Sequence, residues 1–222
     1  MRALLVCAAP APGTLDLLPC LAAAADLIVA VDGGGALCLD AGVMPDVVVG
    51  DFDSLSHADL DRIRASGAVV SQFPAEKDAS DLELAVEEAR IRGATSITVT
   101  AASTGRLDHT LAALGVLVSA AELLPRLAEP GMDVWVMSPQ GRSSTILSGA
   151  GETISVLAFG GPAVVSVKGV IWELESAELS PDSSLGLSNR IGSAGRARIS
   201  VSHGVALLFA PGEARAADAQ AT

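Results

Sequence analysis

The first part of the chain alternates short apolar runs with stretches of helical periodicity. Apolar runs predict strands at 2–9, 27–32, 46–50, 68–73, 96–101 and 132–137. Helical patterns fill the intervals near 15–25, up to Gly42, from 56 to 66, behind Ser80 and from Asp108 onward. Strand–helix alternation with short connections predicts a mostly parallel sheet with helices on both faces, a three-layer α/β domain.

After Pro139 the helical periodicity ends. Short β-rich runs follow at 143–148, 153–159, 163–167, 169–174, 196–202 and 204–209, with Gly, Pro and Ser between them. This pattern is typical of an all-β sandwich. We therefore expect an α/β domain over 1–138, a β-sandwich domain over 139–212, with the boundary near 138–142, and a disordered tail over 213–222.

Composition narrows the partners. The formal net charge is −12, from 26 acidic and 14 basic residues, which argues against duplex nucleic acid as a ligand. A bound metal could still bring a nucleotide to such a chain. No apolar stretch reaches the ~18 residues of a membrane span, so no membrane partner is expected. The three cysteines are odd in number and lie in apolar elements, which predicts reduced thiols and a cytoplasmic location.

Carboxylates follow several of the predicted strands, and the clearest pair is Asp51 and Asp53 after 46–50. Residues two apart on a strand face the same way, so both carboxylates could face one ion while Phe52 packs inward. A solvated turn is the alternative, since Asp is common in turns. Because strand ends of an open α/β sheet share one edge, carboxylates gathered there favour a Mg²⁺ site, and Mg²⁺ usually accompanies a phosphate substrate.

A second acidic group surrounds one of only two lysines in the chain, Lys77. Lys77 is interpreted either as a phosphate-binding cation or as half of a surface ion pair. Ser80 and Glu83 have the spacing of a capping box. Asp78 and Asp81 therefore lie at a helix N-terminus, where negative charge is favoured in any case.

A third group contains Arg106, Asp108 and His109. Arg106 could stabilise developing phosphate charge. Asp108 could join the other carboxylates at the sheet edge, or it could simply be a helix N-cap. A single histidine such as His109 is more often packed or hydrogen-bonded. Asp32 with Gly33-Gly34 permits close approach of the backbone to a phosphate or sugar, or forms a tight turn. Neither a dinucleotide-binding glycine fingerprint nor a P-loop is present.

Trp172 lies among the β-rich runs. It is either a core aromatic or a platform for a flat ring, which an acidic protein would favour if the ring were cationic.

Taken together, these residues resemble the thiamine pyrophosphokinase family. The resemblance rests on Asp32-Gly33-Gly34, the segment from Pro45 to Ser54, the segment from Phe73 to Glu83, and Gly105-Arg106-Leu107-Asp108-His109-Thr110, with a looser match at 169–174 and Ser188-Asn189. Two departures are Ser80, where the family usually has Thr, and Ala101-Ala102-Ser103-Thr104, where it is usually richer in glycine.

The resemblance implies an α/β domain joined to a β-sandwich, and a homodimer with each site shared between two chains. It implies the reaction of ATP with thiamine to give AMP and thiamine diphosphate. The implied metal ligands are Asp51, Asp53 and Asp81, with Asp108 nearby and positive charge from Lys77 and Arg106. The residues implied for the nucleotide are Asp32, Gly33, Gly34, Asp78, Ser80 and His109, and those for thiamine are Trp172, Ser188 and Asn189.

Three alternatives remain open. A related pyrophosphokinase could act on another heterocyclic alcohol, such as a hydroxymethylpterin. A nucleotide-sugar glycosyltransferase would also place Asp-x-Asp after a strand, but it leaves 77–81 and 106–109 unexplained. A non-catalytic thiamine- or nucleotide-binding module would keep Trp172 and lose the metal carboxylates.

Overall fold

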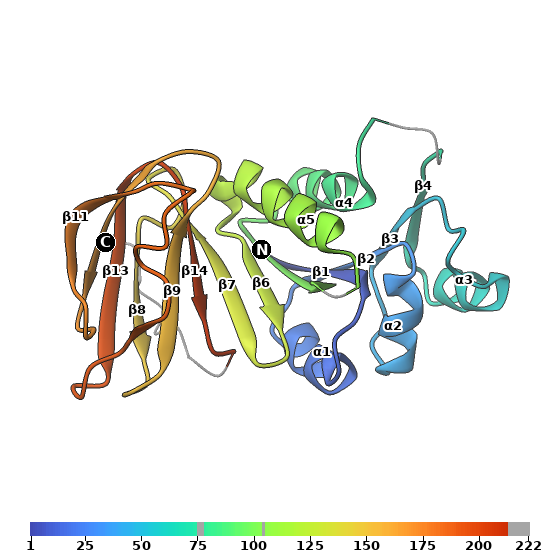
Figure 1. Ribbon diagram of the computed structural model, residues 1–222. Coiled ribbons are helices and arrows are strands. Elements are labelled where there is room, and N and C mark those ends of the chain that lie inside the picture. The colour runs from blue at the N-terminus through green and yellow to red at the C-terminus, as the bar shows by residue number, and fades with distance from the viewer. Residues whose placement is uncertain (75–77, 104, 213–222) are drawn as a thin grey trace. The chain divides into compact units, whose positions relative to one another are not determined.

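The computed structural model describes residues 1–74, 78–103 and 105–212, in two compact units, Met1–Pro130 and Gly131–Thr222 (Figure 1). Lys77, Thr104 and the expected tail at 213–222 lie outside the described residues.

The first unit is built on a parallel sheet in the order β6-β5-β1-β2-β3-β4. Its strands are β1 (Arg2–Ala9), β2 (Leu27–Val31), β3 (Val47–Gly50), β4 (Val69–Gln72), β5 (Ser96–Ala102) and β6 (Arg126–Glu129). The helices are α1 (Thr14–Ala23), α2 (Gly34–Asp40), α3 (His57–Ala65), α4 (Asp81–Ile91), α5 (Leu107–Ser119) and the short η1 (Ala121–Leu123). In Figure 1, α4 and α5 lie on one side of this sheet and α1 and α2 on the other, which confirms the predicted α/β layers.

The connection after β2 is one place where the sheet requires glycine. A Cβ at Gly34 would lie 1.9 Å from the backbone oxygen of Val6 in β1. Only glycine therefore lets α2 begin so close to the central strand. This glycine has a packing role irrespective of any ligand.

Helix α4 begins with the capping box that the spacing predicted. The Ser80 hydroxyl oxygen accepts the N–H of Glu83 at 3.3 Å, and the Glu83 carboxylate accepts the N–H of Ser80 at 2.7 Å. Such caps satisfy backbone donors that a helix leaves unpaired at its first turn. The cap thereby sets where Asp81, the first helical residue, is held.

The second unit contains two antiparallel four-stranded groups, β12-β9-β14-β7 and β11-β10-β13-β8. Their strands are β7 (Met132–Met137), β8 (Ser144–Ser148), β9 (Thr153–Ala158), β10 (Ala163–Lys168), β11 (Leu174–Leu179), β12 (Asn189–Arg190), β13 (Arg196–His203) and β14 (Ala206–Ala210). Alternate residues such as Ala197, Ile199 and Val201 of β13 enter one shared apolar core. Alternation with period two is what a sandwich requires, because each sheet buries a single face.

Three strand assignments differ from expectation. Residues 132–137 were expected in the α/β half, but β7 pairs with β14 in the second unit. The structure consequently divides the chain at 130/131, ahead of the expected boundary. The run at 169–174 is mostly a loop, with β11 beginning only at Leu174, and β6 was not predicted. Strand partners depend on contacts distant in sequence, so apolar runs alone do not assign them.

Within the described residues, no helix is long and apolar enough to cross a membrane.

Candidate active site

Three carboxylates converge beyond the carboxyl ends of β2 and β3. One oxygen each from Asp32, Asp51 and Asp53 lies within 4.8 Å of the others. Asp32 follows β2 and the other two follow β3, and these strands are parallel neighbours. Ser54 lies between two of the acids, with its Oγ 2.8 Å from Asp32 Oδ2 and 2.8 Å from Asp53 Oδ1. We call Asp32, Asp51 and Asp53 the acidic cluster.

The chain reaches this arrangement through a turn and not through strand alternation. β3 ends at Gly50, and Phe52 adopts a left-handed conformation with φ 65°. The N–H of Phe52 donates to Asp32 Oδ1 at 3.2 Å, and the N–H of Asp53 donates to Asp51 Oδ1 at 3.1 Å. The side chain of Phe52 is buried, as predicted, but the reason was wrong: the turn, not a strand register, directs its two neighbours to one side.

The donor set of the acidic cluster fits a hard divalent cation. Mg²⁺ takes oxygen ligands at about 2.1 Å, which places those oxygens roughly 3 to 4 Å apart. Oxygens already within 4.8 Å would need to approach one another by an ångström or so. The residues able to hold Mg²⁺ are therefore Asp32, Asp51 and Asp53. Asp32 was expected to contact the nucleotide, and Asp81, expected as a ligand, is not in the cluster that the described residues form.

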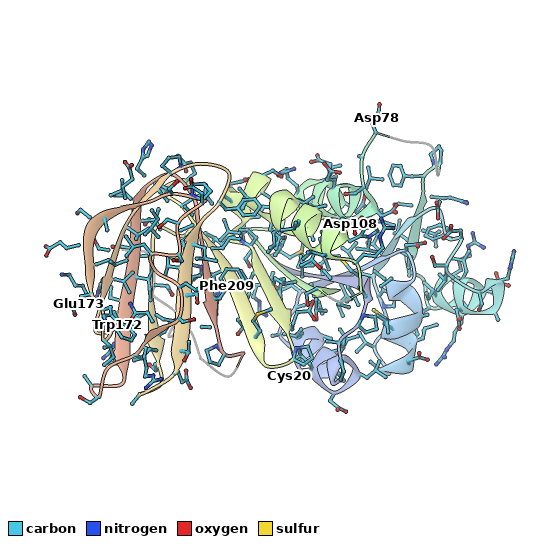
Figure 2. The ribbon with its side chains drawn as sticks, in the orientation of Figure 1. Cys20, Asp78, Asp108, Trp172, Glu173 and Phe209 are labelled. Atoms are coloured by element: carbon cyan, nitrogen blue, oxygen red, sulfur yellow. The ribbon has the colours of Figure 1, made fainter. Side chains whose placement is uncertain are left out.

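The second predicted group lies around the start of α4. Asp81 is half-buried at the first helical position, while Asp78 is exposed on the segment before it, where Figure 2 shows it at the outer end of that segment. The Ser80 hydroxyl donates to Glu83 Oε2 at 2.8 Å within the capping box. In this structure the Ser80 side chain therefore caps the N-terminus of α4, and a role for Ser80 in binding a nucleotide remains a prediction.

The third group forms an ion pair of its own. Arg106 Nη2 lies 2.6 Å from Asp108 Oδ2, and its Nε donates to Asp108 Oδ1 at 3.2 Å. Hydrogen bonding from the guanidinium lowers the pKa of Asp108. Both side chains are exposed, as is His109. A phosphate would have to replace Asp108 as the partner of Arg106, and Arg106 favours either anion because its donors are planar and paired.

Sequence reasoning missed a buried carboxyl, Glu129, at the carboxyl end of β6. Glu129 is 3% exposed, and its Oε1 accepts the N–H of Ala102 at 2.8 Å, while Oε2 has no hydrogen-bond partner among the described residues. Burial raises the pKa of Glu129 despite hydrogen bonds from the backbone at the end of β5. The Glu129 carboxyl therefore holds the backbone at the end of β5. An acid in the short run 126–129 gave no signal of this, because that run was not recognised as a strand.

Backbone strain gathers at these segments. Non-glycine residues with positive φ include Asp32 of the acidic cluster, Phe52 between its other two members, Ala101 at the end of β5, and Ser188 in the second unit. Such conformations cost of order 1–3 kcal/mol each and persist where surrounding contacts over-determine them. The turns after β2 and β3 are thus held in unusual backbone geometry.

In the second unit, the residues predicted for a flat ring lie close together. Trp172 is 63% exposed on the loop before β11, where Figure 2 shows it beside Glu173. The buried Asn189 donates its Nδ2 proton to the Trp172 carbonyl at 2.7 Å. Ser188 is exposed, and its N–H donates to Ser155 Oγ at 2.9 Å. Trp172 is therefore not a core aromatic.

Comparison with known proteins gives the family. Residues 18–126 match the model of the thiamin pyrophosphokinase catalytic domain, and residues 143–206 match that of the thiamin pyrophosphokinase vitamin B1 binding domain. Together these matches cover most of the chain. The chain belongs to the thiamine pyrophosphokinase family.

Individual thiamine pyrophosphokinases are similar in sequence and fold. The chain is 34% identical over 110 residues to thiamine pyrophosphokinase of Bacillus subtilis (strain 168), an alignment covering 48% of this chain and 51% of the relative. The aligned part thus spans about half the length of that curated relative. The crystal structure of the Bacillus subtilis enzyme has a TM-score of 0.79 at 25% identity, covering 95% of this chain and 99% of that one. The Geobacillus thermodenitrificans structure has a TM-score of 0.77 at 25% identity, covering 95% and 97%.

The two thiamine pyrophosphokinase models divide the predicted residues between them. The catalytic-domain match contains the acidic cluster, Asp81 and the Arg106–Asp108 pair, and the vitamin B1 match contains Trp172, Ser188 and Asn189. Glu129 lies between the two matched ranges. The residues predicted for metal and phosphate therefore fall within the catalytic-domain match, and those predicted for thiamine fall within the vitamin B1 binding-domain match.

Proposed function

We propose that this protein transfers a pyrophosphoryl group from ATP to the hydroxyl of thiamine in a Mg²⁺-dependent reaction. The oxygen of the thiamine hydroxyl would bond to the β-phosphorus of ATP as the bond from that phosphorus to the α–β bridging oxygen breaks. The hydroxyl loses its proton, and the products are thiamine diphosphate and AMP. The observation that carries the proposal is the acidic cluster at neighbouring strand ends in a chain of this family.

Each group of residues has a part in this reaction. Asp32, Asp51 and Asp53 would hold Mg²⁺, which supplies neutralisation of charge on phosphate oxygens. Asp81, which lies outside the acidic cluster, would join the metal ligands only once ATP is bound. Asp108 would lie near the metal and Lys77 would contact phosphate, as the resemblance implies. Arg106 would give up its ion pair with Asp108 and bind phosphate oxygens of ATP in its place. Asp78, Ser80, His109 and the Gly33-Gly34 turn remain the residues proposed for the nucleotide.

Thiamine is the acceptor that the second unit favours. An exposed indole offers a face to a flat cationic ring, and stacking of a cation on Trp is worth ~0.5–2 kcal/mol. The match of 143–206 to a vitamin B1 binding domain favours thiamine over a pterin. The retained acidic cluster argues for catalysis and against a binding module.

We also propose a homodimer with shared sites, and a cytoplasmic location. Large apolar side chains are exposed on both units: Leu107 and Leu111 at the start of α5, and Ile171, Trp172, Leu185 and Leu187 in the second unit. Exposed apolar side chains mark an interaction site where they form a patch, and we propose that these side chains lie in such an interface. Sedimentation of the purified protein tests this, and a monomer at micromolar concentration would contradict it.

The direct test is a product assay with ATP, Mg²⁺ and thiamine, with AMP and thiamine diphosphate both quantified. Asp51→Asn should lower kcat/KM at least ~100-fold, equivalent to about 2.7 kcal/mol of transition-state stabilisation. Asp61→Asn, an exposed acid of α3 outside the acidic cluster, is the matched control and should behave as wild type. Wild-type protein that forms neither product, or an Asp51→Asn variant with near-normal turnover, would reject the proposal.

A further inference from the structure

Trp172 combines an exposed ring with a firmly held backbone. Its N–H donates to Asn189 Oδ1 at 3.2 Å, and its carbonyl accepts from Asn189 Nδ2 at 2.7 Å. One side chain, 17 positions away, thus satisfies both backbone polar groups of the residue. Trp172 as a whole remains 63% exposed, so the contact with Asn189 holds the main chain of Trp172 and does not bury the residue.

The Asn189 amide has little capacity left for a ligand. Its Oδ1 also accepts the N–H of Arg190 at 2.8 Å, so two backbone donors occupy that oxygen. One of the two Nδ2 protons is given to Trp172. The side chain is buried, at 5% exposure. An amide oxygen accepts about two hydrogen bonds, so direct recognition of a substrate by this group is limited to one remaining N–H.

The rest of the loop is fastened in the same way. The N–H of Gly169 donates to Glu173 Oε1 at 2.7 Å, and the N–H of Ile171 donates to the Arg190 carbonyl at 2.9 Å. Gly169 itself has φ +76°, and a Cβ there would lie 2.2 Å from the Arg196 backbone oxygen. The residues expected to form a strand instead form a loop whose polar backbone is anchored at successive positions.

We infer that Asn189 is a positioning residue that acts on thiamine through Trp172, and not a residue that contacts thiamine. This inference rests on the proposed function, since it assigns to Trp172 the face on which the acceptor stacks. Because the backbone of Trp172 is already held in place, its ring loses less conformational entropy when a ligand stacks on it, and binding is tighter as a result. Removing the Asn189 amide leaves the backbone N–H and carbonyl of Trp172 without these partners, so the loop adopts a wider range of conformations.

A double-mutant cycle separates action through Trp172 from direct contact. Asn189→Asp keeps the acceptor for the Trp172 N–H but places a carboxylate against its carbonyl. We expect it to raise the KM for thiamine about tenfold and leave the KM for ATP unchanged. In a Trp172→Ala background, Asn189→Asp should change the thiamine KM by less than about twofold. Effects that multiply in the double variant would overturn the inference, because they indicate independent contact with thiamine.

A second readout needs no catalysis. With 5-fluorotryptophan incorporated, the chain gives two ¹⁹F resonances, from Trp135 and Trp172, and loss of one in Trp172→Phe assigns it. Asn189→Asp should narrow and shift the Trp172 line and leave the line of the buried Trp135 unchanged. Arg190→Gln is the matched control, because the contacts of Arg190 in this loop come from its backbone. An unchanged Trp172 line in Asn189→Asp would overturn the inference.

The double-mutant cycle and the ¹⁹F measurement together also distinguish failure of this inference from failure of the proposed function. Wild-type protein that makes no thiamine diphosphate would remove the proposed reaction, while the ¹⁹F arm still decides whether Asn189 holds Trp172. If wild-type protein is active and the effects of Asn189→Asp and Trp172→Ala on the KM for thiamine multiply, only the inference about Asn189 is rejected. If Asn189→Asp does not fold, Asn189→Ser is the second variant, since it removes the same carbonyl contact without adding a charge.

Discussion

Replacing one member of the acidic cluster should stabilise the metal-free protein and remove most of its stabilisation by Mg²⁺. Asp53→Asn removes a charge while its amide oxygen can still accept from Ser54 Oγ, which lies 2.8 Å from Asp53 Oδ1. The variant thus changes electrostatics and leaves the local hydrogen bonding in place. Stability and function are expected to move in opposite directions, as is common at sites selected for activity.

The magnitude follows from the spacing of the charges. Two unit charges 4.8 Å apart, the outer limit for the cluster, repel by about 1 kcal/mol at the dielectric constant of water and by about 3–4 kcal/mol at an effective value of 20. Asp53 is exposed, so the lower figure applies to each of its two neighbours. Asp53→Asn should therefore raise the free energy of unfolding of the metal-free protein by about 1–2 kcal/mol.

Urea unfolding with EDTA and with saturating Mg²⁺ measures both effects. Wild-type protein should gain about 2.7 kcal/mol when Mg²⁺ is a hundredfold above its Kd, and Asp53→Asn should lose most of that gain. Asp61→Asn, which removes the same charge from an exposed acid elsewhere, should change neither quantity by more than ~0.5 kcal/mol.

Two further substitutions decide between the metal ligands expected from the sequence and those that the acidic cluster offers. Asp32→Asn should remove the Mg²⁺-dependent gain, and Asp81→Asn should retain it in the absence of ATP. The reasoning would be refuted by a metal-free Asp53→Asn that is no more stable than wild type, or by a Mg²⁺ response that needs Asp81 and not Asp32.

Three other tests, two of them with a comparison variant, address individual contacts. Burial raises the pKa of Glu129 above its usual 4.5, so the contribution of Glu129 to stability is complete at low pH and is lost as the pH rises through the raised pKa. The free energy of unfolding of Glu129→Gln should therefore exceed that of wild type by an amount that grows from pH 5 to 8. A difference that stays constant with pH would contradict this. Gly34→Ala should destabilise the protein by at least about 3 kcal/mol in chemical unfolding, because its Cβ meets the Val6 oxygen at 1.9 Å, whereas Gly115→Ala, with open space around it in α5, should be neutral or stabilising. Ser80→Ala should cost about 1 kcal/mol through loss of the cap on α4 and Ser80→Thr should cost much less; equal unfolding midpoints for the two would exclude the cap as the cause.

The local pattern of the sequence was sufficient for the architecture and for much of the site. Apolar runs separated by helical periodicity identified β1 to β5, because buried parallel strands need continuous apolar stretches. Asp51 and Asp53 could be predicted as partners because they follow one strand. The capping box at Ser80 was also predictable, since its hydrogen bonds join residues three apart.

What the sequence determined by itself was therefore whatever depends on neighbours along the chain: helix starts, strand ends, and carboxylates at those ends. The tertiary structure alone decided which of these meet. Asp32 joins the acidic cluster because β2 pairs with β3, Glu129 reaches Ala102 because β6 is placed beside β5, and Asn189 holds Trp172 across 17 positions. The order of the strands and the hydrogen bonds that hold the loops depend on contacts between segments far apart in the sequence. The free energies of those contacts cannot be read from the pattern of neighbouring residues.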